Sequence, residues 1–463
     1  MLRASVVVMA DHPPREPVEP DDEGDATGEF RDMLRDFLAG DTDIDPARLA
    51  SAAGLPDDPE MVQRLIGQLQ QALQNSGDGI NWGLAIEQAR TLAGRSAVPS
   101  TPAERSALEQ ALHVAALWLD EATSISTLTT EPVLLTRAGW AEATMPVWTQ
   151  LAEPVANSIA DALTRVLEEH APEELGGMLG GAGKLMRNIG GTLFAMQLGQ
   201  VVGQLAAEAV SGGDVGIPLL DGETGQAALV PQNVDDFGRG LDIPVDEIRL
   251  YLSVRELAHA RLFRHAKWLR LHVLTQITEV AHGTRIDMEK LEELAADLDP
   301  QNPEELRAAL QSGALIPPKT DEQLAALARL ETMLALIEGW VDVVTAAATT
   351  RLPHAAAIAE TVRRRRAAGG PAESAFSTLV GLELRPRRLR EAAAMWQAVH
   401  DAVGADERDD LWAHPDVVPT DADIDAPAAL VARLTGPAPE PDDVDRALRD
   451  LLDDSTGDRP HEE

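Results

Sequence analysis

The chain of 463 residues has no cysteine, one tyrosine and few aromatic residues, which make up only 3% of the sequence. Without cysteine, the protein can form neither disulfides nor metal sites with thiolate ligands. Any metal ion would therefore need histidine and carboxylate ligands. Alanine and leucine dominate the apolar residues, and runs of β-branched residues are few. This composition favours helices over sheets.

Basic residues are also scarce. The chain has 39 Lys and Arg against 77 Asp and Glu, which gives a formal net charge of −38. Such a charge opposes binding to nucleic acid and to anionic lipid, and we expect neither partner. The uncharged run 189–206 is interrupted by three glutamines, which argues against a membrane span. The apolar run 4–10 is too short and poorly flanked for an export signal, so we expect a cytoplasmic protein.

Composition divides the chain into four parts. Residues 1–29 are rich in Pro, Asp and Glu, which predicts disorder, and acids and prolines return in a predicted acidic tail, 436–463. Between them we expect an N-terminal helical layer, 30–130, and a larger helical domain, 131–435. Apolar residues at helical spacing predict helices at 30–38, 59–74, 101–123, 246–283, 288–298, 303–312, 320–349 and 353–368. Trp140, Trp148 and the periodicity of 145–167 predict two more helices.

Several local signals refine this outline. Either Ser100 or Thr101, with Pro102 and Glu104, and Thr320 with Gln323 have the signature of a capped helix start. Gly199 and its neighbour one turn on, Gly203, predict the close approach of another helix. Only 216–222 and 227–231 read as extended segments, on either side of an Asp-Gly turn. They predict a short β-hairpin or strand pair in an otherwise mainly α fold.

The segment Asp246 to Gly283 predicts one long, largely buried helix that carries Arg255-Glu256-Leu-Ala-His259. This motif differs by one residue from His-Glu-x-x-His, in which two histidines on one helix face hold zinc and the glutamate activates the metal-bound water. Arg255 stands in place of the first histidine. A guanidinium offers only hydrogen-bond donors and stays protonated, so it cannot serve as a metal ligand.

A second acidic pair, Glu338 and Asp342, shares one face of the apolar helix predicted at 320–349. Buried carboxylates need partners, and two interpretations remain open. In the first, Glu338 is a metal ligand and Asp342 orients a ligand histidine. In the second, one of the two acids pairs with Arg255. The basic run 363–366 is predicted to neutralise carboxylates nearby.

Several separate motifs follow one another over about residues 130–435: Arg255 to Phe263 with Trp268-Leu-Arg, Ile337 to Asp342, Arg363 to Gly370, Val380 to Arg387 and Leu411 to Asp416. Together they resemble the actinobacterial family of zincin-like metallopeptidases and hydrolases, which has a sister branch associated with deazaflavin-cofactor biosynthesis. The resemblance implies a mainly α zincin-like body and a zinc cofactor. It also implies Glu256 as the general base, His259 and Glu338 as metal ligands, and Asp342 as their support.

Arg255 separates two functional hypotheses. The first is a zinc metallopeptidase or other metal-assisted hydrolase with a degenerate motif, in which Glu256 activates the water. The second is an inactive pseudo-metallopeptidase that binds a peptide or protein or acts as a scaffold. Tyr251, Arg255 and His259 are expected on one helix face, with the Tyr251 hydroxyl near the site. If the cleft binds peptide, Ala227 to Val230 should present an open strand edge toward Glu256.

Overall fold

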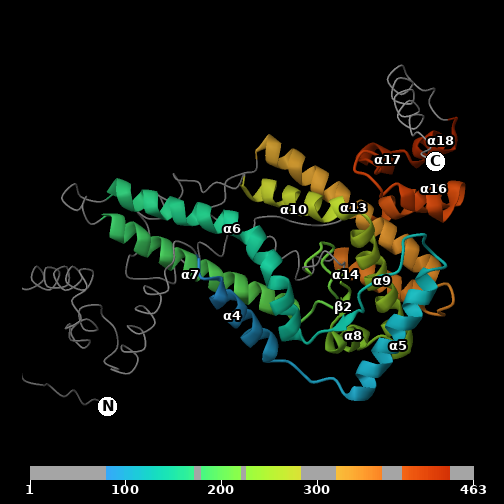
Figure 1. Ribbon diagram of the computed structural model, residues 1–463, viewed down its shortest axis with the longest axis horizontal. Helices are drawn as coiled ribbons and strands as arrows, with labels where there is room; N and C mark the ends of the chain where they lie inside the picture. The colour runs from blue at the N-terminus through green and yellow to red at the C-terminus, as the bar shows by residue number, and fades with distance from the viewer. Residues whose placement is uncertain (1–79, 171–178, 221–225, 283–319, 368–387, 438–463) are drawn as a thin grey trace, which may run out of the picture. The chain divides into compact units, whose positions relative to one another are not determined.

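The computed structural model describes residues 80–170, 179–220, 226–282, 320–367 and 388–437. These residues are mainly helical, as predicted (Figure 1). The helices are α4 (Trp82–Gly94), α5 (Pro102–Leu119), α6 (Arg137–His170), α7 (Leu179–Ala206), α8 (Pro231–Gly238), α9 (Val245–His265), α10 (Lys267–His282), α13 (Asp321–Ala348), α14 (Ala355–Ala367), α16 (Leu389–Asp410), α17 (Asp421–Asp425) and α18 (Pro427–Thr435), and the strands are β1 (Val133–Leu134) and β2 (Ala228–Leu229).

One compact unit, residues 80–170 and 189–463, contains nearly all of the described structure. Its core includes five buried tryptophans, at positions 140, 148, 340, 396 and 412. Helices α4 and α5, from the predicted N-terminal layer, share this core with the helices that follow. The boundary at residue 130 stays a prediction. Across the described parts of the chain, no helix has both the length and the apolar character that a membrane span requires.

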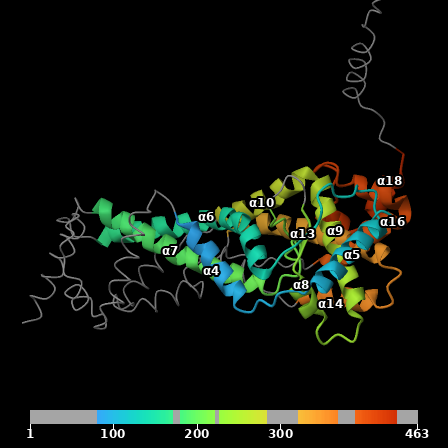
Figure 2. The ribbon, with the colours of Figure 1, turned by 60° about the horizontal axis from the view of Figure 1, so that its bottom comes forward.

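Helix α9 lies at the centre of this unit, packed against α5, α8, α10, α13 and α14. Figures 1 and 2 both show α5 alongside it. The prediction of one helix from Asp246 to Gly283 is wrong. Ala266 leaves the helical conformation with ψ 75° and separates α9 from α10. After this break the Trp268 indole donates to Trp412 O at 3.0 Å. The apolar periodicity continues across Ala266, so it does not reveal a break that is followed directly by a tertiary contact.

The two helices predicted around 145–167 are one helix, α6, of 34 residues. It continues through Pro146 and Pro154, although each proline removes one helical hydrogen bond. Trp140 and Trp148 on this helix are 0% and 1% exposed. Burial of both tryptophans on the common core favours the continuous helix despite the missing bonds.

Both predicted capping boxes are present: Thr101 and Thr320 each accept from the backbone three residues on, and the side chains of Glu104 and Gln323 reach back. The predicted approach of a helix to Gly199 is also confirmed. A Cβ there would lie 2.5 Å from Ala85 O of α4. The predictions for 1–29, 30–38, 59–74, 288–298, 303–312, 380–387 and 438–463 lie outside the described residues.

The strand pair is confirmed, but its partners differ from those predicted. β2 pairs in parallel with β1, with Val133 opposite Ala228, whereas residues 216–220 form no strand and 221–225 lie outside the description. On its other side β2 meets Ser211 in an antiparallel bridge to Leu229. Of the two predicted alternatives, a hairpin or a strand pair, the described residues form a strand pair, and a pairing over 90 positions of sequence leaves no local turn signal.

Candidate active site

Helix α9 carries the residues predicted for the site. Tyr251, Arg255 and His259 are spaced by one turn and share a face, and Glu256 lies beside them. All four are at most 8% exposed. Helix α13 contributes Glu338, which is 1% exposed, and Asp342, which is 4% exposed. The two helices contact each other directly, so the structure brings together the residues that the motif and the later acidic pair predicted.

Glu338 lies between two guanidinium groups. Arg255 Nη2 donates to Glu338 Oε2, and Arg366 Nη1 of α14 forms an ion pair with Glu338 Oε1 at 2.6 Å. Burial opposes ionisation of Glu338, but Arg366 and then Arg255 outweigh it and hold the carboxyl pKa below its usual range. The site therefore contains one buried carboxylate shared by two buried cations.

Asp342 does not complete this cluster. Its carboxylate accepts from Arg363 Nη2 at 2.7 Å, and Arg363 Nε lies 3.3 Å from the same oxygen. Of the two carboxylates considered as partners for Arg255, Glu338 is the one that binds it. The basic run at 363–366 therefore does neutralise carboxylates, as predicted, and two of these lie on α13.

Glu256 joins α9 to two backbone segments. Its Oε2 accepts from Gly213 N at 2.9 Å and its Oε1 accepts from Ala228 N of β2 at 2.9 Å. Burial is the largest influence on this carboxyl and raises its pKa, against the opposing effect of these hydrogen bonds. A raised pKa suits a general base, but here the carboxylate also fixes the backbone around it.

His259 is a neutral imidazole. Burial lowers its pKa to about 4, and the nearby Glu338 only partly offsets this effect. The ring packs on Phe263, with centroids 4.8 Å apart, and its buried Nε2 has no hydrogen-bond partner among the described residues. An unpaired ring nitrogen of this kind is free to bind a ligand.

The surrounding donor set does not fit zinc, however. A catalytic zinc site needs three protein ligands, and Arg255 cannot act as one of them. Both oxygens of Glu338 already face cations, which would also repel a divalent ion. Within the described ranges no three His, Asp or Glu side chains are grouped as metal ligands. These residues build an ion-pair cluster in the place where the motif predicts a metal.

Sequence reasoning missed a loop that completes the site, residues 210–216. Asp214 of this loop accepts from Val210 N at 3.0 Å and pairs with Arg365 Nη1 at 3.1 Å. The Asp214 main-chain oxygen accepts from Arg366 Nη2 at 2.6 Å. The cluster of glycines at 212, 213 and 216 was the signal that could have marked this loop, because glycine allows a close approach of backbone to side chains.

Comparison with known proteins places this arrangement in a family. A model described as "Zincin-like metallopeptidase" matches residues 80–431. A solved structure from Chloroflexus aurantiacus, provisionally described as a hydrolase with a novel fold, aligns with a TM-score of 0.53 and 20% identity, covering 78% of this chain and 100% of that one. At this identity the likeness shows a shared fold. No curated protein matches the sequence. The family match spans well over half of the chain, which therefore belongs to the zincin-like metallopeptidase family.

Proposed function

We propose that this chain is a pseudo-metallopeptidase, a family member that binds a peptide or protein without metal-dependent hydrolysis. The observation that carries the proposal is the position of Glu338, whose two carboxylate oxygens each face an arginine. The resemblance to the family implies that Glu338 is the ligand contributed by the later helix. Here it is already neutralised by residues of the chain itself.

Charge balance supports this interpretation. A zinc ion carries two positive charges, and Arg255 and Arg366 together carry two. Because both guanidiniums are largely buried beside Glu338, they compensate the carboxylate electrostatically, as a metal ion would. They cannot polarise a bound water as a Lewis acid does. The presence of Arg255 therefore favours a protein that keeps the family fold but has lost metal-dependent hydrolysis.

The alternative function is a zinc-dependent hydrolase. It is favoured by the neutral imidazole of His259, with its unpaired Nε2, and by the raised pKa of Glu256. For metal to bind, however, Glu338 would have to leave both arginines. Separation of a buried carboxylate from its cations is strongly unfavourable, so the pseudo-metallopeptidase accounts for more of the site.

Zinc binding distinguishes the two functions. The protein is purified without chelators and without a metal-affinity tag, its zinc content is measured, and thermal unfolding is followed with and without added zinc. We expect neither stoichiometric zinc nor a shift of Tm. The double variant Arg255→His, Arg366→Gln should gain zinc binding, because it supplies the missing imidazole and frees Glu338.

The matched control is Arg255→His combined with Arg364→Gln. Arg364 is exposed and pairs with Glu360 at 3.0 Å, so this control leaves Arg366 on Glu338 and should not gain zinc. Stoichiometric zinc in the unmodified protein, or its stabilisation by added zinc, would contradict the proposal.

A further inference from the structure

The edge of β2 that faces the site is covered by the chain's own loop. Gly212 N donates to Ala228 O at 2.9 Å and Val230 N donates to Val210 O at 2.9 Å, with the loop antiparallel to β2. β1 occupies the other edge. The open edge at 227–230 that was expected if the cleft binds peptide is therefore not present, and this finding counts against an unobstructed peptidase cleft. An extended peptide that added to β2 would make the same main-chain bonds as the loop.

The loop also reaches the motif residues. Gly213 N donates to Glu256 Oε2. A Cβ at Gly213 would lie 2.4 Å from His259 Nδ1 and 3.0 Å from Glu256 Oε2. Only a main chain without side chains can lie this close to both residues. Gly216, with φ 83°, places the next turn against Glu338. Glycine main chain therefore lies against Glu256, His259 and Glu338 in turn.

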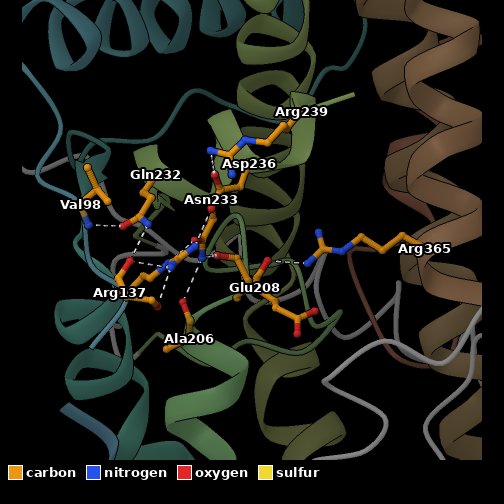
Figure 3. A network of polar contacts seen from close by, with 11 residues as sticks. Val98, Arg137, Ala206, Glu208, Gln232, Asn233, Asp236, Arg239 and Arg365 are labelled. Atoms are coloured by element: carbon orange, nitrogen blue, oxygen red, sulfur yellow. Dashed lines mark hydrogen bonds and ion pairs between the residues drawn. The ribbon is translucent and has the colours of Figure 1, made fainter. Parts of the chain in front are cut away.

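Polar side chains hold the loop and the residues that lead into it. The Asn233 amide donates to Ala206 O at 3.0 Å and to Ala209 O at 2.6 Å. Arg365 donates to Glu208 O at 2.5 Å (Figure 3), and Arg366 reaches the main-chain oxygen of Asp214. The central residues of the loop, 211–214, carry no apolar side chain. Their release would therefore break hydrogen bonds and ion pairs but remove little apolar area from the core.

We propose that residues 210–216 act as an internal pseudosubstrate that fills the peptide-binding site of this chain. The ligand class follows from the loop itself. It is an extended peptide with glycine at the two positions beside Glu256 and His259. The next residue is acidic: its carboxylate pairs with Arg365, and its main-chain oxygen accepts from Arg366. A partner peptide of this kind binds when 211–214 leave. The inference rests on the proposed binding function, but its tests measure neither metal nor hydrolysis.

The first test is amide hydrogen exchange of the full chain. Arg365→Ala removes the contacts to Glu208 O and Asp214, and we expect the amides of Gly212 and Gly213 to exchange at least about tenfold faster. Arg364→Ala is the matched control in the same helix, and it should leave these rates unchanged. If these amides exchange only with global unfolding in both variants and in the unmodified protein, the loop does not leave and the proposal is wrong.

The second test is peptide binding. A labelled, end-blocked peptide that copies residues 208–216 is titrated against the unmodified protein, Gly212→Ala and Gly213→Ala, since Arg365→Ala would also remove a contact that the peptide needs. The added Cβ of either variant displaces the loop and leaves Arg365 and Arg366 in place, so we expect both variants to bind the peptide at least about tenfold more tightly than the unmodified protein. A second peptide with alanine in place of the glycine pair should bind neither variant, because its Cβ atoms meet His259 and Glu256.

The control for the glycine change is Gly94→Ala, where an added Cβ meets nothing within 4 Å. If Gly213→Ala does not fold, Gly212→Ala carries the test, because its added Cβ meets the flexible end of the Leu220 side chain. Absence of peptide binding in a folded variant with fast loop exchange would overturn the proposal. Zinc found in the unmodified protein would contradict the pseudo-metallopeptidase but would not alter these exchange rates or affinities, so the two failures are distinguishable.

Discussion

Arg255 on α9 and Glu338 on α13, separated by 83 positions in the sequence, form an ion pair inside the protein. Their side chains are 10% and 1% exposed. Since Arg366 pairs with the same carboxylate, Glu338 lies between two largely buried like charges. The fold is therefore expected to depend on Glu338 more than on either arginine alone.

Replacement of Glu338 should destabilise the protein strongly. Glu338→Gln removes the carboxylate that pairs with both Arg255 and Arg366, and we expect it to lower the free energy of unfolding by about 3–5 kcal/mol. Arg255→Ala should cost about 3 kcal/mol, at the lower end of that range, because Arg366 still pairs with Glu338. Urea unfolding measures both. Glu360→Gln is the control: this carboxylate pairs with Arg364 and Arg390 at the surface, and its loss should change stability little. Equal effects of Glu338→Gln and Glu360→Gln would show that the buried cluster is not a stabilising element.

A second buried carboxylate, Asp409, connects three parts of the core. It accepts from Thr123 Oγ1 at 2.6 Å, from Trp340 Nε1 at 2.9 Å and from Arg408 Nε at 2.7 Å. Asp409→Ala leaves Arg408, which is 0% exposed, without its counter-charge, and should lower the free energy of unfolding by about 3–5 kcal/mol. Tryptophan fluorescence during urea unfolding reports the change. Asp410→Ala, at an exposed neighbouring position, should have little effect. A similar loss of stability in both variants would contradict the role of Asp409 as the buried counter-charge of Arg408.

Much of the fold was predictable because local signals mark it. The capping residues Thr101 and Thr320 and the apolar periodicity located helix starts and faces. The break at Ala266 and the pairing of Val133 with Ala228 were not predictable, because each depends on contacts with distant parts of the chain. A two-residue strand has no periodicity of its own to detect.

The site was predictable in part, for a physical reason. A buried arginine and a buried acidic pair require counter-charges, so Arg255 was expected to meet Glu338 or Asp342. The second cation, Arg366, is one of four consecutive arginines, and only packing decides which of them turns inward. The position of Gly213 depends on how the loop folds onto β2. Sequence spacing therefore located the charges but not the backbone that covers them.

The contact between α7 and α4 gives a steric prediction. A Cβ added at Gly199 would lie 2.5 Å from Ala85 O and 2.8 Å from Gln88 Cβ, and a backbone carbonyl cannot move without shifting α4. Gly199→Ala should therefore destabilise the protein by about 1–3 kcal/mol, although alanine favours helix by about 1 kcal/mol. Thermal unfolding measures the balance. Gly94→Ala, in open space on α4, should leave Tm unchanged or raise it. A neutral Gly199→Ala would mean that the helices do not approach as closely as described.

The last prediction uses Tyr251, the only tyrosine in the chain. It is 1% exposed, and burial raises its pKa to about 12, against a smaller opposing effect of Arg255. An unfolded tyrosine titrates near about 10. Phenolate absorbance of the folded protein should therefore stay absent as pH passes 10 and rise only near 12. In urea the same absorbance should develop near the ordinary value.

The shift has a consequence for stability whose sign can be derived. Because the folded pKa lies above the unfolded one, the stabilising contribution of the neutral phenol is fully present below about pH 10 and is lost as pH rises toward 12. Tyr251→Phe cannot ionise, so its free energy of unfolding should fall less steeply over this interval than that of the unmodified protein. Other groups titrate equally in both proteins, and the difference isolates Tyr251. Phenolate formation near pH 10 in the folded protein would mean that water reaches the hydroxyl, and that the face of α9 carrying Arg255 and His259 is open to solvent.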